Sequence, residues 1–275
     1  MASLAKEIVL ITGANSGIGY ELARQLLSLG TYHILLTARS PTRGTTALQT
    51  LQSLSLPGTI EFLPLDTTSD TDIAAATAHI TKTHARLDVL VNNAAIAPFT
   101  SNPTRTQFRD AFDTNATGPY LLSQSLIGLL QQSANPRIVN VSSGAGSIGR
   151  RLAAESPMYK IQAEAYRASK VAMNMLTTCL WVEFGLGFGP DARGEGEVGG
   201  AWGEGGMGED GEGKKRVKVF AYDPGFTVSN LSEMNTEANG ARSAEDSVKS
   251  LMDVILGKRD GEVGRFIHNT GGYPW

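Results

Sequence analysis

The feature that most constrains this chain is a glycine-rich turn close to its N-terminus. Residues 12–19 read Thr-Gly-Ala-Asn-Ser-Gly-Ile-Gly and directly follow the strand-like run Glu7–Ile11. Glycines allow a tight turn and a close approach to a ligand, and the free N–H groups of a following helix attract an anion. A strand, such a turn and a helix together predict a dinucleotide site. The turn residues expected to contact it are Gly13, Asn15, Ser16, Gly17, Ile18 and Gly19.

Strand-like and helical segments alternate along the rest of the chain. The expected strands are Glu7–Ile11, His33–Ala38, Thr59–Pro64, Leu87–Asn92, Arg137–Ser142, Val217–Tyr222 and Gly264–His268. The expected helices are Gly17–Leu29, Thr42–Leu54, Asp70–Ala85, Thr104–Gln132, Pro157–Phe184 and Ala244–Leu256. Strands that are apolar almost throughout are typical of parallel sheets covered on both faces. The alternation predicts an α/β fold, a doubly wound parallel sheet of about seven strands, in a single domain over residues 1–275.

One segment departs from this pattern. Residues 185–213 are dominated by glycine and acidic side chains, and Lys-Lys-Arg follows at 214–216. Such a stretch buries too little apolar surface to offset the entropy lost on ordering, which predicts a disordered surface insertion at about 185–216. An inert insertion is the simpler interpretation, and the alternative is a partner site anchored by Trp202 and Met207.

Bulk composition excludes several classes of protein. The formal net charge is −3, with both signs mixed along the chain, which argues against a nucleic-acid partner. No apolar run approaches the ~20 residues of a membrane span, and Met1–Lys6 is too short and polar for a signal peptide. The lone Cys179 excludes an intramolecular disulfide and is expected to be a small core residue. We therefore expect a cytoplasmic protein.

The end of the second strand indicates which dinucleotide is bound. Folds that prefer NAD place an acid there to hold the ribose 2′-hydroxyl, but this strand ends Leu-Thr-Ala-Arg-Ser at residues 36–40. Arg39, with Arg43 beside it, offers a planar cation suited to a 2′-phosphate, which predicts NADPH/NADP+ as cofactor. A merely solvated arginine is the alternative.

The third strand is followed by a further pair of candidate cofactor contacts. The carboxylate of Asp66 is suited to accept from an adenine amino group, and Thr67 adds a backbone donor. The alternative for Asp66 is to cap the helix that begins near Ser69.

Tyr166 and Lys170 carry the predicted chemistry. They are four residues apart, hence on one face of a helix. Reduction of a carbonyl by hydride transfer needs a donor to the oxygen and an acid. A free phenol titrates near pH ~10, and a nearby ammonium is expected to lower the pKa of Tyr166. The pair predicts nicotinamide-dependent carbonyl chemistry, and we expect no metal-binding residues in the chain.

These motifs together resemble the short-chain dehydrogenase/reductase family. The residues that carry the resemblance are Asn92-Asn93-Ala94-Ala95, Asn115, Ser142-Ser143, Tyr166-x-x-x-Lys170 and Pro224-Gly225. Residues 37–39, 42–44 and 87–94 are most similar to NADPH-dependent carbonyl reductases. The resemblance covers nearly the whole chain except residues 185–216, and it implies a Rossmann-type domain with its site at the carboxyl ends of the strands.

The resemblance also assigns roles to individual residues. It implies that Tyr166 is the general acid, that Ser143 rather than Ser142 binds the substrate oxygen, and that Lys170 also binds the nicotinamide ribose. It further implies that Asn115 supports a water chain from Lys170, although capping a helix or stabilising a kink is the alternative for this residue alone. The remaining implied cofactor contacts are Asn93 and Ala94 beside the adenosine ribose, and Pro224, Gly225, Thr227 and Ser229 around the nicotinamide.

Some features depart from the family pattern. Ser16 stands where a phosphate-binding lysine is often found, which leaves more of the charge neutralisation to Arg39. The segment between Ser143 and Tyr166 is longer than usual, so residues 150–162 are expected to form a helical flap over the substrate. An insertion here disturbs the surface used for tetramers, and we expect a monomer or homodimer.

The expected pocket walls at 96–101, 144–158 and 226–234 are mainly apolar. Their apolar members are Ile96, Phe99, Ile148, Leu152, Met158, Phe226, Leu231 and Met234. The leading hypothesis is an NADPH-dependent oxidoreductase that reduces an apolar ketone, aldehyde or quinone-type carbonyl to an alcohol. The alternatives are an NADP-dependent dehydrogenase of steroid- or retinoid-like alcohols, and a non-redox isomerase or cofactor sensor with the same fold.

Overall fold

Continuous burial along the central strands explains why the chain forms a sheet with two apolar faces. In β1 (Glu7–Ile11), Val9 and Ile11 belong to one buried cluster, and Ile8 and Leu10 belong to another. Successive side chains of a strand point to opposite faces, so helices must cover both sides of this sheet. The computed structural model describes residues 6–155, 159, 161–187 and 213–275.

The described residues form one sheet whose strand order reverses near its middle. The further strands are β2 (Tyr32–Ala38), β3 (Thr59–Pro64), β4 (Val89–Asn92), β5 (Arg137–Val141), β6 (Lys218–Asp223), β7 (Phe266–His268) and β8 (Gly271–Gly272). Their order is β3-β2-β1-β4-β5-β6-β7-β8. The first seven strands pair in parallel, and β8 pairs antiparallel to β7. The predicted doubly wound α/β sheet is confirmed, and a two-residue eighth strand is added.

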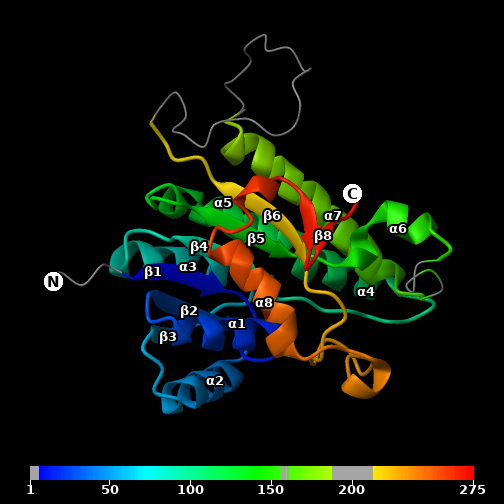
Figure 1. Ribbon diagram of the computed structural model, residues 1–275, viewed down its shortest axis with the longest axis horizontal. Coiled ribbons are helices and arrows are strands. Elements are labelled where there is room, and N and C mark those ends of the chain that lie inside the picture. The colour runs from blue at the N-terminus through cyan, green and yellow to red at the C-terminus, as the bar shows by residue number, and fades with distance from the viewer. Residues whose placement is uncertain (1–5, 156–158, 160, 188–212) are drawn as a thin grey trace, which may run out of the picture.

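Helices cover both faces of the sheet (Figure 1). They are α1 (Gly17–Ser28), α2 (Pro41–Ser53), α3 (Asp70–Thr83), α4 (Arg105–Phe112), α5 (Gly118–Leu130), α6 (Ile148–Leu152), α7 (Glu164–Leu180) and α8 (Ala244–Ile255). Buried side chains of α1, α2 and α8 join the apolar cluster on one face, and those of α3, α5 and α7 join the cluster on the other. Serine hydroxyls cap α2, α3 and α8 at their first turns, which fixes where these helices begin.

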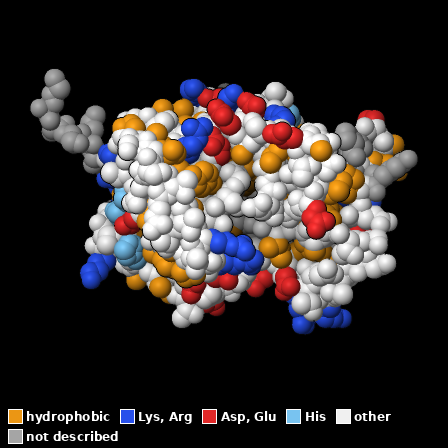
Figure 2. Space-filling view, turned by 90° about the horizontal axis from the view of Figure 1, so that it is seen from below, with side chains coloured by type: hydrophobic (Ala, Val, Ile, Leu, Met, Phe, Trp, Pro, Cys, Tyr) orange, Lys and Arg blue, Asp and Glu red, His pale blue; other side chains and the backbone are white. Residues whose placement is uncertain are grey.

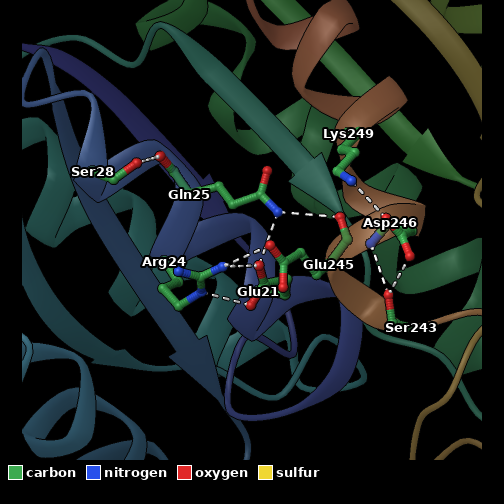
Figure 3. Close-up of polar contacts among 8 residues, drawn as sticks. All are labelled: Glu21, Arg24, Gln25, Ser28, Ser243, Glu245, Asp246 and Lys249. Atoms are coloured by element: carbon green, nitrogen blue, oxygen red, sulfur yellow. Dashed lines mark hydrogen bonds and ion pairs between the residues drawn. The ribbon is translucent and has the colours of Figure 1, made fainter.

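Polar contacts join α1 to α8, two helices far apart in the sequence (Figure 3). The amide of Gln25 donates to the backbone carbonyl of Glu245 at 3.2 Å. Arg24 lies 3.9 Å from the Glu245 carboxylate and 2.6 Å from that of Glu21. The helix that leaves the glycine-rich turn is therefore held to the C-terminal part of the chain.

Two predicted helices differ in extent from those observed. The segment expected as one helix, Thr104–Gln132, is divided into α4 and α5 by a π-helical turn at Asp113–Thr117. Helix α7 begins at Glu164 rather than at residue 157. The Arg167 guanidinium donates to the carbonyl of Ile161 at 3.1 Å, which holds the preceding chain outside the helix.

Other expectations from the sequence have mixed outcomes. Cys179 is exposed, so the expectation of a buried core residue is wrong. The disordered insertion predicted at about 185–216 lies mostly outside the described residues, which resume at 213. Within the described ranges, no helix combines the length and apolar character needed to cross a membrane.

A ladder of buried polar side chains fixes α7 against the sheet. Asn92 Nδ2 donates to Asn140 Oδ1 at 2.8 Å, and Asn140 Nδ2 donates to Thr177 Oγ1 at 2.9 Å. One turn away, Ser142 Oγ donates to Asn174 Oδ1 at 2.6 Å. All five residues are buried, so each lost partner leaves a polar group unpaired in the interior.

Replacing Thr177 by valine tests this ladder. The change keeps the shape but leaves the Asn140 amide without its acceptor, and we expect a loss of about 1–3 kcal/mol in the free energy of unfolding. Urea denaturation measures the loss. The matched control is Thr178→Val on the less buried side of the same helix, expected to cost about 0.5 kcal/mol or less. Equal losses in the two variants would contradict a role for the ladder.

Candidate active site

A pocket lies at the carboxyl ends of the strands, where the strand order reverses between β1 and β4. This is where open α/β sheets bind ligands. Figure 2 shows a hollow near the centre of one face of the molecule, with basic side chains beside it. The predicted site residues that line the pocket are Gly13, Asn15, Ser16, Gly17, Ile18, Arg39, Asp66, Thr67, Asn93, Ala94, Ser143, Tyr166, Lys170, Pro224, Gly225, Thr227 and Ser229. Gly19 and Asn115 are the two predicted residues outside this lining.

The glycines of the first turn are required by conformation and by packing. Gly13 and Gly17 have φ values of +63° and +56°, which side-chain-bearing residues rarely adopt. A Cβ on Gly13 would lie 3.0 Å from the Cα of Ala94, and one on Gly19 would lie 2.6 Å from Asn93 Nδ2. The turn thus forms an open backbone cradle, and Gly19 contributes by allowing the loop after β4 to approach.

Thr12 holds this loop in place. Its hydroxyl accepts from the backbone N–H groups of Asn93 and Ala94, both at 2.9 Å. The Asn93 side chain in turn donates to the Thr12 carbonyl at 2.8 Å. The loop therefore lies beside the cradle through hydrogen bonds that need no ligand.

Two arginines face the phosphate end of the pocket. Arg39 directly follows β2, Arg43 lies in the first turn of α2, and both line the pocket. Neither guanidinium has a hydrogen-bond or ion-pair partner within the ranges the structure describes. Two exposed cations that are not neutralised by neighbours are available to an anionic group.

Asp66 also lines the pocket, and it is not the cap of α3. Ser69 caps that helix by accepting from Asp72 N–H at 3.2 Å. Asp66 Oδ1 accepts from the backbone and hydroxyl of Thr68, at 3.0 and 2.8 Å. The contact of Asp66 with the adenine remains a prediction. The alternative, that Asp66 caps α3, is wrong because Ser69 is the cap.

The reacting end of the pocket brings the predicted phenol and hydroxyl together. Tyr166 is buried, and the ring of Phe99 packs against it with centroids 5.8 Å apart. Burial raises the pKa of Tyr166 to about 12, and the Ser143 side chain opposes that rise. The Ser142 hydroxyl is bonded to Asn174, so Ser143 is the serine at the phenol.

Lys170 is buried beside the phenol, and its effect differs from our expectation. Nζ lies 5.9 Å from the ring centroid of Tyr166 and donates to the carbonyl of Val141 at 2.7 Å. Burial lowers the pKa of Lys170 from 10.5 to about 7, which the charge of Asp223 partly opposes. Desolvation is the largest influence on the pKa of both groups, and the charge of Lys170 does not offset the effect of burial on the phenol. The expected lowering of the pKa of Tyr166 is wrong for this form of the protein.

Asn115 lies in the π-helical turn between α4 and α5. Its side chain accepts from Ile96 N–H at 2.9 Å and donates to the Ile96 carbonyl at 2.8 Å and to Ser169 Oγ at 2.9 Å. Of the two structural alternatives for this residue, capping and kink stabilisation, these contacts favour stabilisation of the kink. They also position Ile96, which lines the pocket.

Two charged residues near the site were not found from the sequence. Asp223 ends β6, is buried in the pocket wall and accepts from Gly225 N–H at 2.8 Å. Its position directly before Pro224-Gly225 was the available signal. Arg150 lies over the ring of Tyr273 at 4.2 Å, a contact made by the C-terminal segment that no local pattern reveals. Within the described part of the expected flap at 150–162, only residues 150–152 are helical, and they form the end of α6.

Comparison with known proteins places this chain in a family. Residues 7–186 match the short chain dehydrogenase family. A short-chain dehydrogenase/reductase of Aspergillus fumigatus is 31% identical over 264 residues, which cover 93% of this chain and 92% of that protein. The short-chain dehydrogenase anuI of Penicillium roqueforti is 37% identical over 187 residues, 64% of this chain and 72% of that one.

A solved structure agrees with these relatives. The NADPH-bound carbonyl reductase from chicken fatty liver is 27% identical and superimposes with a TM-score of 0.77, covering 99% of this chain and 100% of that chain. The chain belongs to the short-chain dehydrogenase/reductase family and is an oxidoreductase with a Rossmann fold. The resemblance drawn from the sequence is confirmed.

Lys170 makes the free energy of unfolding depend on pH, and a methionine at this position would not. Between its folded pKa of about 7 and its ordinary value of 10.5, the unfolded chain binds more protons, so stability rises with pH. Between roughly pH 7.5 and 9.5, we expect the free energy of unfolding of the wild type to rise by up to about 1.4 kcal/mol per pH unit relative to Lys170→Met. Urea denaturation across this range measures it. Identical slopes would show that the lysine keeps its ordinary pKa.

Proposed function

We propose that this protein is an NADPH-dependent reductase of apolar ketones, aldehydes or quinone-type carbonyls. The observation that carries the proposal is the convergence of three side chains in one pocket. The buried phenol of Tyr166 lies against the Ser143 side chain, and Lys170 lies behind it, in the pocket that also holds the glycine cradle. A hydroxyl pair beside a dinucleotide site is suited to bind and protonate a carbonyl oxygen.

The cradle and the two arginines fit NADPH. Gly13 lies in the turn before α1 and Gly17 begins that helix, whose first-turn N–H groups suit a pyrophosphate. The end of β2 carries Arg39 in place of an acid, and the unpaired guanidinium suits a 2′-phosphate. The carbonyl reductase from chicken, which is similar over its whole length, was solved with NADPH. When bound, this cofactor supplies the hydride.

The chain's own residues bind the carbonyl and deliver the proton. The Ser143 hydroxyl and the Tyr166 phenol donate hydrogen bonds to the substrate oxygen, which favours the negative charge that develops there. The raised pKa of Tyr166 keeps the phenol protonated at neutral pH, so the proton is present when the oxygen becomes basic. Once Tyr166 has given up its proton, Lys170 is the nearest buried amine that can reprotonate the phenol. Asp223 favours the protonated form of the lysine.

The surroundings of Tyr166 support an apolar substrate. Ile96 and Leu231 line the pocket, and Phe99 packs on the phenol while remaining partly exposed. Further exposed apolar side chains stand on the segments expected as pocket walls: Ile148, Leu152, Phe226 and Met234. Met158, another expected wall residue, lies outside the described residues. Exposed apolar side chains grouped around a site are typical of ligand-binding surfaces.

Replacing Tyr166 by phenylalanine tests the reaction. We expect turnover of NADPH with a panel of ketones, aldehydes and quinones to fall by about 10²–10⁴-fold in kcat/KM, because the acid is lost. The matched control is Tyr120→Phe, which removes a phenol on α5 that bonds to Gln124. NADPH binding, followed by fluorescence, should persist in both variants. Turnover unaffected by the loss of Tyr166, or absent in the wild type on every carbonyl, would overturn the proposal.

Replacing Arg39 by alanine tests the choice of cofactor. A charge-assisted contact of about 1.5–3 kcal/mol corresponds to roughly a 10- to 100-fold increase in KM for NADPH, and the KM for NADH should not rise. Steady-state kinetics with both dinucleotides measure it. Arg109→Ala on α4, away from the pocket lining, is the control. Equal weakening of both dinucleotides would assign Arg39 a structural role only.

A further inference from the structure

Three of the chain's four histidines gather around one glutamate, in a part of the fold that the proposed reaction does not use. His33 is the second residue of β2 and Glu61 lies in β3. His79 lies near the end of α3, and His84 directly follows that helix. The Glu61 carboxylate oxygen Oε1 lies 3.8, 3.4 and 3.0 Å from the Nε2 atoms of His33, His79 and His84. These elements meet at the amino ends of the strands, at the opposite edge of the sheet from the pocket.

These separations match the spacing of ligands around a tetrahedral metal ion. Zinc binds imidazole nitrogen and carboxylate oxygen at about 2.0–2.2 Å, which places neighbouring ligand atoms of a tetrahedron about 3.3–3.6 Å apart. The ligand atoms of His33, Glu61 and His84 all lie within 4.8 Å of one another. Only small side-chain movements separate this arrangement from a coordinated one.

His33 carries an independent indication of a ligand. Its Nε2 atom is buried and has no hydrogen-bond partner within the described part of the chain. Its Nδ1 atom lies 2.8 Å from Thr59 Oγ1, a contact that fixes the ring and can accept the Nδ1 proton. The Nε2 lone pair then points at the cluster without a donor, as expected of an imidazole prepared by its second hydrogen bond to bind a metal.

We propose that His33, His84 and Glu61 bind a Zn²⁺ ion, with His79 completing the coordination. The His79 imidazole lies 3.4 Å from the same carboxylate, and its side chain is 39% exposed, so it can turn to reach the ion. Imidazole and carboxylate ligands suit zinc among the biologically common divalent ions. Bound there, the ion would join β2, β3 and the end of α3.

Zn²⁺ titration of the full-length, untagged protein after chelator dialysis tests the proposal. We expect one Zn²⁺ per chain by calorimetry and, at a hundredfold excess over Kd, a rise in Tm of about 5–10 °C. Co²⁺ in its place should give the intense visible absorption of a four-coordinate site. No stoichiometric binding, or only the weak absorption of six-coordinate Co²⁺, would overturn the proposal and leave a hydrogen-bonded network.

Variants identify the ligands. Glu61→Gln and His84→Gln should each weaken Zn²⁺ binding by at least about tenfold. His268→Gln changes the one histidine outside the cluster, which stacks on Tyr273, and should bind Zn²⁺ like the wild type. Circular dichroism checks that each variant folds, and the Co²⁺ spectrum of the wild type remains decisive if one does not. Unchanged affinity in the folded Glu61 and His84 variants would contradict the assignment.

Discussion

Buried hydrogen bonds between the strand ends and α7 determine where the chemistry of this protein takes place. Asn92 and Asn140 pair across β4 and β5, and Thr177 links that pair to the helix. An unpaired amide in this interior costs about 1–3 kcal/mol, so the helix cannot rotate or slide without breaking several such bonds. Because its register is fixed, Tyr166 and Lys170 both face the carboxyl edge of the sheet.

The burial that fixes these side chains also changes their acid–base properties. Desolvation raises the pKa of Tyr166 to about 12 and lowers that of Lys170 to about 7. The two shifts bring the pKa of the lysine close to neutral pH and keep the phenol protonated. The site therefore retains transferable protons while carrying little charge. Asp223 is the buried acid that moderates this balance, through its effect on Lys170.

Local sequence patterns predicted correctly those parts of the fold that depend on residues close together in the chain. The strand–turn–helix around Gly13–Gly19 follows from an apolar run and from glycine positions, and the parallel, doubly wound character of the sheet follows from the alternation of strands and helices. The start of α7 was misplaced because the Arg167 contact with Ile161 joins segments through tertiary structure. The histidine cluster was missed for the same reason, since its residues come from β2, β3 and the end of α3 with no motif spacing to reveal them.

Strand β2 connects the two ends of the molecule at which ligands are proposed. His33 lies at its start and Arg39 follows its last residue, so six residues of extended chain separate them by about 20 Å. At physiological ionic strength charges are screened over about 8 Å, and a divalent ion at His33 has little direct electrostatic effect on Arg39. Any influence of one site on the other must pass through the register of β2 against β1 and β3. Because β2 is paired with both β1 and β3, the proposed metal site and the proposed reduction site are expected to act as separate functions of one rigid sheet.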